Sequence, residues 1–281
     1  MDYLKRGLRR TFASIKDHKI LFGIVFLLQL LFLVSFLSVA IYYQVKLLED
    51  ASGIIEPLEK ANYNAEMIQE GAPFTEDYLR VFNSYNSMVQ NLKEFVIALL
   101  LLFFFVNGAI WMLSHWLLEE KIHWKQKPKK AFQFLLKMAA SAAALLVPFL
   151  IPSYYLLSRF IRISGSFSKV VLAIEILLGA GAVLYYLFIV SLAAADIASW
   201  KRFARRWLDL SFRKIAKTAP ALLLVALAFF LSSLLLYAAI NYGRSFLLLA
   251  AAGIAEISVL VLTRIFFIAC LQEIGHETDN H

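Results

Sequence analysis

The sequence predicts an all-α fold, a polytopic membrane helical bundle whose six transmembrane helices form three repeated hairpins. Composition is the first indication, because 61% of the 281 residues are hydrophobic and only 17% are charged. In a soluble domain about a quarter of the residues are charged. The second indication is that the charges are confined to segments between long apolar stretches, and the third is a match of the chain to itself at a fixed spacing.

The apolar stretches have the length of membrane spans. Each holds about 20 to 26 residues, which a helix needs to cross some 30 Å of hydrocarbon. Because hydrocarbon offers no partner for backbone N–H and C=O groups, such segments must be helical. The first stretch is too long for a signal-peptide core and ends in bulky residues, so we expect it to be retained. The expected spans are residues 20–43, 96–118, 138–157, 170–195, 219–240 and 246–271.

The distribution of basic residues predicts the orientation. Lys and Arg are concentrated in cytoplasmic connections of membrane proteins. One set of connections here holds more than twice as many basic residues as the other, so we place both termini in the cytoplasm and the chain in the plasma membrane. The expected cytoplasmic segments are residues 1–19, 119–137, 196–218 and 272–281, and the expected outer segments are residues 44–95, 158–169 and 241–245.

The chain matches itself when it is shifted by 76 residues. The shift brings the span that begins at Val170 onto the span that begins at Phe246. A match at a fixed period indicates that one supersecondary unit is used more than once. The unit consists of a basic helix, a span, an outer turn and a returning span, and the N-terminal third is a looser copy. The shift also superposes Glu120, Trp124, Lys129, Lys130 and Lys137 on Asp196, Trp200, Arg205, Arg206 and Arg213.

Basic stretches precede the first, third and fifth spans. In the first and last of them apolar residues recur every three or four positions, which predicts an amphipathic helix. Such helices lie in the membrane interface with their basic residues near anionic lipid head groups. Pro128 interrupts the middle copy, and the alternative for all three is an ordinary cytoplasmic loop. The residues expected at anionic head groups are Arg9, Arg10, Lys129, Lys130, Arg205, Arg206, Arg213 and Lys214.

The outer segment 44–95 has substantial soluble character, and we expect it to form a small helical cap. Thr75 precedes two acids and an apolar stripe that runs into the second span, which is typical of a helix N-cap. The second helix should therefore project beyond the bilayer. Gly53 and Pro57, like Gly71 and Pro73, should divide the preceding stretch into shorter helices or turns.

Three ionisable residues lie inside the expected spans. Glu175 falls in the fourth span, and Glu256 and Arg264 lie eight residues apart on nearly the same face of the sixth. Because a charge at mid-bilayer costs about 2.5 to 3.5 kcal/mol, these side chains should face the bundle interior, where they could line a polar path. The alternative is structural, since Glu175 could reach the outer interface and Arg264 could extend toward the inner one.

Other residues in the spans are interpreted as packing features. Gln29 and Asn107 are expected to form interhelical hydrogen bonds. Pro148 and Pro152 remove two helical donors and should kink the third span. Small residues at matching repeat positions should allow close helix approach, and they are Gly179, Gly181 and the run 250–253.

The sequence contains no catalytic motif, so we expect neither an enzyme nor a cofactor. It has no phosphate-binding loop, nucleophile elbow or dinucleotide fingerprint. The five histidines, His115 among them, are scattered near tails and inner boundaries and are interpreted as solvated or interfacial. Cys270 is the single cysteine, so the sequence predicts no disulfide framework and no cysteine metal site. The net charge of +8 follows the positive-inside rule and does not indicate nucleic-acid binding.

The basic stretches with an adjacent aromatic residue feed paired spans, as in Lys129-Lys130-Ala131-Phe132 and Arg205-Arg206-Trp207. This pattern, repeated over six spans, resembles the prokaryotic six-span membrane-domain family that is fused in some proteins to glycerophosphodiester phosphodiesterases. The resemblance is architectural and covers most of the chain, although the long outer insertion departs from it. It implies a six-span fold, and because the soluble phosphodiesterase domain is absent here it does not imply that activity.

Two functional classes are compatible with these observations. The first is a permease-like bundle that moves a small solute or lipid, with Glu256, Glu175 and Arg264 along the route; an ATPase docked on the inner helices could drive it. The second is a non-catalytic membrane platform whose basic helices bind anionic lipid or a partner protein. Beyond the bilayer, the expected partners are anionic lipid head groups and an ATPase or another membrane protein.

Overall fold

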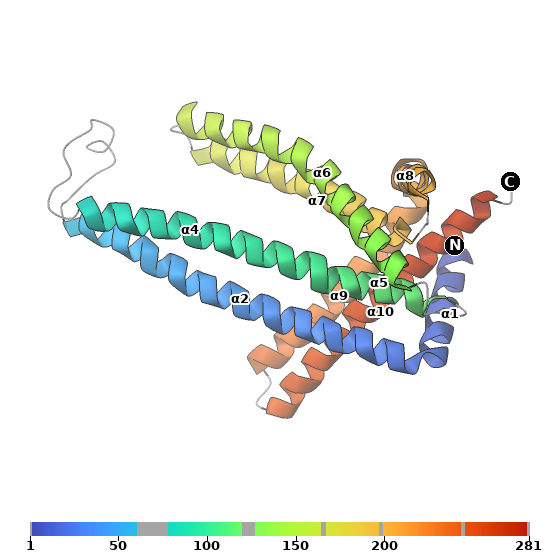
Figure 1. The fold of residues 1–281 in the computed structure, drawn as a ribbon. Coiled ribbons are helices and arrows are strands. Elements are labelled where there is room, and N and C mark those ends of the chain that lie inside the picture. The colour runs from blue at the N-terminus through green and yellow to red at the C-terminus, as the bar shows by residue number, and fades with distance from the viewer. Residues whose placement is uncertain are drawn as a thin grey trace. The chain divides into compact units, whose positions relative to one another are not determined.

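The computed structural model describes residues 2–60, 78–119, 127–163, 167–196, 199–242 and 245–279. All regular secondary structure in these ranges is helical (Figure 1). Six of the described helices are long and apolar enough to cross a membrane, which confirms the all-α class and the expected number of candidate spans. The chain divides into two compact units, one formed by residues 30–107 and the other by residues 1–29 and 108–281.

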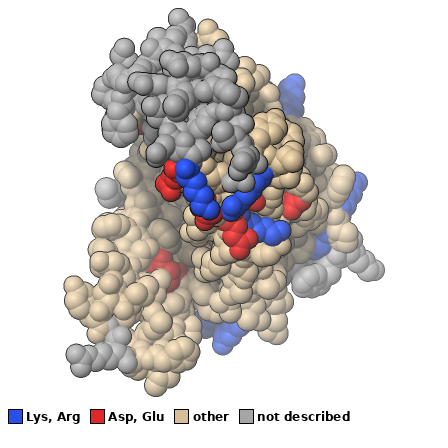
Figure 2. All heavy atoms as spheres, turned by 90° about the vertical axis from the view of Figure 1, so that its left-hand side faces the viewer, with Lys and Arg blue, Asp and Glu red and all other residues tan. Residues whose placement is uncertain are grey.

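The smaller unit is a long antiparallel pair of helices. Polar contacts join the pair along its length: Asn91 Nδ2 donates a hydrogen bond to Asp50 Oδ2 at 2.7 Å, and Arg80 forms an ion pair with Glu56 at 2.9 Å. Figure 2 shows acidic and basic side chains gathered in one patch on a face that is otherwise largely uncharged. The elements are α2 (Lys19–Lys60), which begins in the larger unit, α4 (Tyr78–Leu102) and the π-helix η1 (Phe103–Asn107).

Helix α2 passes through Gly53 and Pro57 without interruption, so the predicted break at these two residues is wrong. Gly53 lies where α2 approaches α4 closely, and a Cβ there would collide with the side chain of Ser84. Pro57 removes one backbone hydrogen bond, the one to the Gly53 carbonyl, and the helix ends three residues later at Lys60. The expected cap at Thr75, together with Gly71 and Pro73, lies outside the described residues.

The larger unit contains two pairs of spans and two shorter amphipathic helices. Its α6 packs along α7 and its α9 along α10, while α1 packs against α10. The smaller unit ends at Asn107, the last residue of η1, and the chain returns to the larger unit at Gly108, the first residue of α5. The elements are α1 (Asp2–Asp17), α5 (Gly108–Leu117), α6 (Lys127–Ile163), α7 (Phe167–Ala194), α8 (Trp200–Leu208), the π-helix η3 (Asp209–Arg213), α9 (Ile215–Tyr242) and α10 (Phe246–Asp279).

The close packing of α1 on α10 depends on Gly7. A Cβ at this position would lie 3.2 Å from the backbone nitrogen and 3.3 Å from the Cα of Cys270. The nearest atom would be the Cys270 Sγ at 2.5 Å, and because backbone atoms cannot move aside as the end of a side chain can, a larger residue at position 7 would push the two helices apart. The amphipathic helix expected over residues 1–19 is therefore present, and it is fixed to the last span.

Prolines in α6 do not end the helix. Pro128 is its second residue, a position where the missing N–H is not needed, so it marks the start of α6 and does not interrupt it. Pro148 and Pro152 lie inside the continuous helix, which is visibly curved (Figure 1). The helix continues to Ile163, six residues beyond the expected end of the third span.

The segment between α7 and α9 holds two elements where the sequence predicted one amphipathic helix. Helix α8 buries Phe203 and leaves most of its basic side chains exposed. The backbone leaves helical geometry at Lys214, directly after η3, and α8 runs across the direction of α9 (Figure 1). The threefold repeat of hairpins stays a prediction, and two of its matched residues, Glu120 and Trp124, lie outside the described residues.

Candidate functional site

Arg264 on α10 lies between side chains of α2 and α5. Its Nη2 donates a hydrogen bond to Oε1 of Gln29 at 2.8 Å, and its guanidinium carbon lies 5.3 Å from the centre of the Trp111 ring. The other terminal nitrogen, Nη1, is buried without a hydrogen-bond partner among the described residues. The interhelical hydrogen bond expected for Gln29 is thus confirmed. Its oxygen and the face of Trp111 offset part of the cost of a cation within a span.

Glu256 lies on the same helix, closer to its N-terminal end. The residue is 8% exposed, and its Oε1 accepts a hydrogen bond from Ser233 Oγ of α9 at 2.8 Å. The second carboxyl oxygen, Oε2, is buried and has no partner in the described part of the chain. Since buried polar atoms are nearly always hydrogen-bonded, this oxygen has capacity for water or a ligand.

The structure does not join the three ionisable residues of the predicted polar path. Glu256 and Arg264 are separated by eight residues of helix, about 12 Å of rise, and no ion pair between them is seen in the described residues. Glu175 is exposed on α7 and contacts neither of them through a hydrogen bond or ion pair within the described ranges. Two separate polar positions on α10 are therefore present, and a path that includes Glu175 stays a prediction.

Five side chains, four of them basic and the fifth His18, contact backbone carbonyl oxygens of helices that come later in the chain. The carbonyls of Leu118, Glu119 and Ala195 directly follow the ends of α5 and α7 and carry the negative end of the helix dipole, so a cation there is stabilising, whereas Gln272 and Ile274 lie inside α10. On the 76-residue shift, Glu119 falls on Ala195 and Lys137 on Arg213, the neighbour of Lys214, which supports the repeat without establishing it. The contacts are Arg10 Nη2 to Leu118 O at 3.3 Å, His18 Nε2 to Glu119 O at 3.2 Å, Lys137 Nζ to Ala195 O at 3.0 Å, Arg206 Nη2 to Gln272 O at 3.4 Å and Lys214 Nζ to Ile274 O at 2.8 Å.

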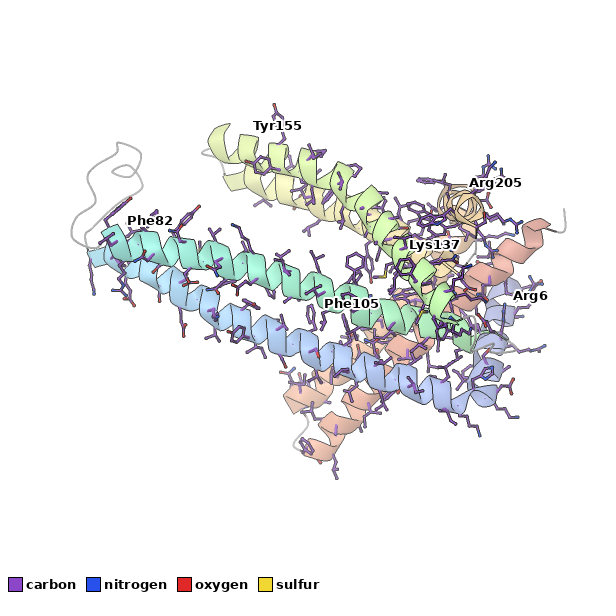
Figure 3. All side chains as sticks on the ribbon, in the orientation of Figure 1. Arg6, Phe82, Phe105, Lys137, Tyr155 and Arg205 are labelled. Atoms are coloured by element: carbon purple, nitrogen blue, oxygen red, sulfur yellow. The ribbon has the colours of Figure 1, made fainter. Side chains whose placement is uncertain are left out.

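The eight basic residues expected at lipid head groups fall into two sets. Figure 3 shows Arg205 pointing away from α8, whereas Lys137, which was not among the eight, lies among packed helices. One set binds carbonyl oxygens within the protein and comprises Arg10, Arg206 and Lys214. The other set is exposed, and we call it the exposed basic set: Arg9, Lys129, Lys130, Arg205 and Arg213.

Acidic residues neutralise part of the basic charge at this end of the larger unit. Glu273 pairs with Arg6 at 3.1 Å and with Arg10 at 3.5 Å, and Glu119 pairs with Lys127 at 2.6 Å. A polar cavity of about 580 Å³ is lined by more acidic than basic side chains, and Arg6 and Lys127 pair with two of its carboxylates from outside the lining. Its charged or ionisable lining residues are Arg10, Asp17, His18, Glu119 and Glu273.

Two buried polar residues were not recognised from the sequence. His115, interpreted as solvated or interfacial, is 1% exposed; its Nε2 lies 2.9 Å from the Leu192 carbonyl oxygen and its ring 5.6 Å from that of Phe134. That interpretation is wrong, because the last turn of α5 faces α7 and not the solvent. Lys137 is also 1% exposed. Only its repeat match to Arg213 marked it in the sequence.

In the part of the chain that the structure describes, no group of three or more His, Cys, Asp or Glu side chains could hold a metal ion. No protein-family model, curated protein or solved structure matches the chain. The six-span domain family therefore remains a resemblance, and function has to be inferred from the geometry of the site.

Proposed function

We propose that the protein is a permease-like membrane bundle that handles a small solute or a lipid and contacts it through Arg264 and Glu256. The observation that carries the proposal is the buried Nη1 of Arg264, which has no hydrogen-bond partner among the described residues although it lies on a helix apolar enough to span a membrane. A charge kept in a span only for packing should be fully paired. Unused donor capacity at that depth supports contact with a ligand or with water along a route.

Glu256, which lies eight residues before Arg264 on α10, supports the same proposal. One of its oxygens is bound by Ser233 and the other is unpartnered within the described residues. The two positions would be met in sequence by a substrate that moves along α10. Glu175 is a third expected position on the route, and its exposed place on α7 makes it the least supported of the three.

A membrane platform is the second candidate, and the exposed basic set favours it. These five residues lie on α1, α6, α8 and η3 and are exposed. Lys130 pairs with Glu119 at 3.6 Å and Arg213 with Asp209 at 4.0 Å, whereas Arg9, Lys129 and Arg205 form no ion pair within the described residues. Such exposed cations favour contact with anionic head groups or with an acidic face of a partner, including an ATPase. The plasma-membrane location and cytoplasmic termini belong to both candidates as proposals.

Complementation of a deletion strain in the native host tests the permease proposal. Arg264→Gln and Glu256→Gln should each abolish rescue of the deletion phenotype while the protein reaches the membrane in normal amounts. Arg213→Gln is the matched control, since it removes one cation that is 86% exposed in its side chain. Full rescue by both α10 variants would contradict the permease proposal.

The platform candidate makes the opposite prediction in the same assay. Replacing all five residues of the exposed basic set with Gln would abolish rescue, while Arg264→Gln and Glu256→Gln would rescue fully. The two sets share no residue, so the assay separates the candidates.

A further inference from the structure

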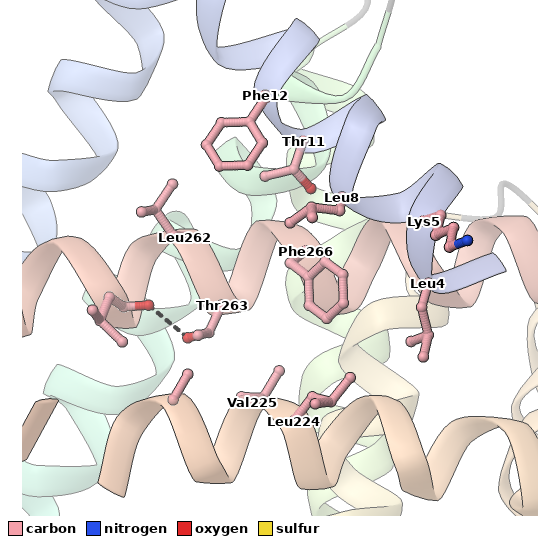
Figure 4. A pocket seen from close by; sticks show the side chains of 12 residues that line it. Leu4, Lys5, Leu8, Thr11, Phe12, Leu224, Val225, Leu262, Thr263 and Phe266 are labelled. Atoms are coloured by element: carbon pink, nitrogen blue, oxygen red, sulfur yellow. Dashed lines mark hydrogen bonds between the residues drawn. The ribbon is translucent and has the colours of Figure 1, made fainter. Parts of the chain in front are cut away.

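A groove of about 470 Å³ lies between α1, α9 and α10, within the larger unit. Leu4 and Leu8 of α1 face Phe266 of α10 and Leu224 of α9 across it (Figure 4). Its volume is within the range of small-molecule pockets, about 300 to 1,000 Å³. The groove is thus large enough for a ligand and is walled by three different helices.

The walls offer almost no free polar group. The two hydroxyls in the lining are satisfied by their own helices: Thr11 Oγ1 donates to the Gly7 carbonyl oxygen at 2.9 Å, and Thr263 Oγ1 donates to the Val259 carbonyl oxygen at 2.7 Å. A polar solute would lose its hydrogen bonds to water there without replacement. The groove therefore selects an apolar ligand or the apolar part of an amphiphile.

One charge, that of Lys5, is present among the lining residues. Lys5 is exposed, and it makes no ion pair or hydrogen bond within the described residues; Arg9, one turn further along α1, is in the same state. Arg6 and Arg10, on another face of this helix, are instead held by Glu273. Helix α1 thus keeps two cations available beside an apolar groove.

The position of the groove relative to the spans adds a constraint. Its α9 and α10 walls belong to helices long and apolar enough to cross a membrane, whereas α1 precedes the first of them. Because α1 is basic and amphipathic, it belongs at the interface. The groove therefore extends from the interface into the depth of the lipid chains, and its one lining cation, Lys5, belongs to the interfacial helix.

We propose that this groove binds one anionic phospholipid, with an acyl chain between α1, α9 and α10 and the phosphate group at Lys5 and Arg9. The apolar lining matches the acyl chain, and the two available cations match the phosphate, whose negative charge is not balanced by an amine in the head group of an anionic phospholipid such as phosphatidylglycerol. A second copy of the protein is disfavoured as occupant, because its surface would have to present a narrow apolar ridge next to an acidic group. The site is separate from Arg264 and Glu256, so it stands whether or not the protein is a permease.

Native mass spectrometry of the full chain in detergent, titrated with phosphatidylglycerol or phosphatidylcholine, tests the proposal. We expect one phosphatidylglycerol to bind about 25-fold more tightly than phosphatidylcholine, because each of the two basic groups near an anionic head group supplies about fivefold. Lys5→Gln should lower this preference about fivefold and leave phosphatidylcholine binding unchanged. Lys16→Gln, the same change on the same helix outside the groove, should retain the preference.

A groove-filling variant tests the acyl-chain part. Ala228→Trp places an indole among the lining residues and should weaken binding of the first phosphatidylglycerol about tenfold or more. Ala226→Trp is the control, since Ala226 is exposed on the same helix and does not line the groove. If Ala228→Trp does not fold, Leu8→Asn puts a polar group into the groove from an exposed position and should weaken binding in the same direction.

Three results would overturn the proposal. They are equal binding of the two lipids to the unmodified protein, unchanged phosphatidylglycerol binding in Ala228→Trp or Leu8→Asn, and an equal loss in Ala226→Trp. The first result would show that the site does not recognise an anionic head group. Either of the other two would show that the lipid does not bind in the groove.

Discussion

Arg264 is held inside a span by neutral partners and not by a carboxylate. Gln29 supplies one acceptor and Trp111 supplies the negative face of its ring. Because neither partner carries a full charge, the positive charge of the guanidinium is not neutralised by a counter-ion. It can therefore attract an anionic group. This distinguishes Arg264 from Arg10, whose charge is opposed by Glu273.

Removing the Gln29 acceptor should destabilise the protein. Gln29→Leu leaves a buried guanidinium nitrogen without its hydrogen bond, and we expect a loss of about 1 to 2 kcal/mol in the free energy of unfolding. Gln44→Leu is the control on the same helix, because Gln44 is exposed. Thermal unfolding in detergent measures both. Equal unfolding temperatures for the two variants would show that the bond contributes nothing.

Two glycines near the N-terminus should respond in opposite ways to the same change. Gly7→Ala introduces a Cβ against the backbone of Cys270 and should lower the unfolding temperature. A Cβ on Gly23 of α2 would have no neighbouring atom within 4 Å, so Gly23→Ala should raise helix stability by about 0.5 to 1 kcal/mol. A stabilising Gly7→Ala would contradict the close packing of α1 on α10.

At the scale of elements, the sequence predicts the type and length of each helix better than it predicts which helices pack together. The amphipathic helices around Arg9 and Arg205 follow from local periodicity, which is a property of the sequence alone. Close helix approach is not local: a Cβ would meet no atom within 4 Å at Gly179, Gly181 or Gly253, whereas it would at Gly7, Gly53, Gly108 and Gly275. Which small residue meets a neighbour depends on how distant helices rotate, and no short-range pattern contains that information.

The contact between Lys137 and the end of α7 should stabilise the second pair of spans. Lys137→Met removes the donor to the Ala195 carbonyl oxygen and the cation at the helix end, and we expect a loss of about 1 to 2 kcal/mol. Lys129→Met is the control, because Lys129 is exposed on the same helix. Unfolding monitored by circular dichroism gives both values. An unchanged unfolding temperature for Lys137→Met would show that its methylene packing matters more than its charge.

The basic residues of α8 and the following segment should separate into lipid-facing and structural pairs. Arg205→Gln with Arg213→Gln should reduce the rise in unfolding temperature that phosphatidylglycerol produces, and should leave the value without lipid unchanged. Arg206→Gln with Lys214→Gln should lower the value without lipid, because these two bind carbonyl oxygens of α10. If both pairs gave the same result, the distinction between the exposed basic set and the inward residues would fail.

At the scale of the whole molecule, composition predicts the membrane class and six candidate spans because charge exclusion is visible in a linear window. A linear window does not predict the candidate site. Gln29 and Arg264 are 235 residues apart, and His115 was misread because its burial depends on α7. The groove between α1, α9 and α10 is lined by residues from both ends of the chain, so no single stretch of the sequence indicates it.

The orientation of the molecule in its membrane is the last prediction. An excess of Lys and Arg on one set of connections should hold that set in the cytoplasm, so α8 faces inward and the far end of α2 faces outward. Single cysteines at Ser52 and Ala204, both exposed, report the two sides in a Cys270→Ala background. An impermeant thiol reagent should label position 52 in intact cells and position 204 only after lysis. The unaltered chain should stay unlabelled in both cases, because Cys270 is 0% exposed. Labelling of position 204 in intact cells would reverse the orientation and move the exposed basic set to the outer surface.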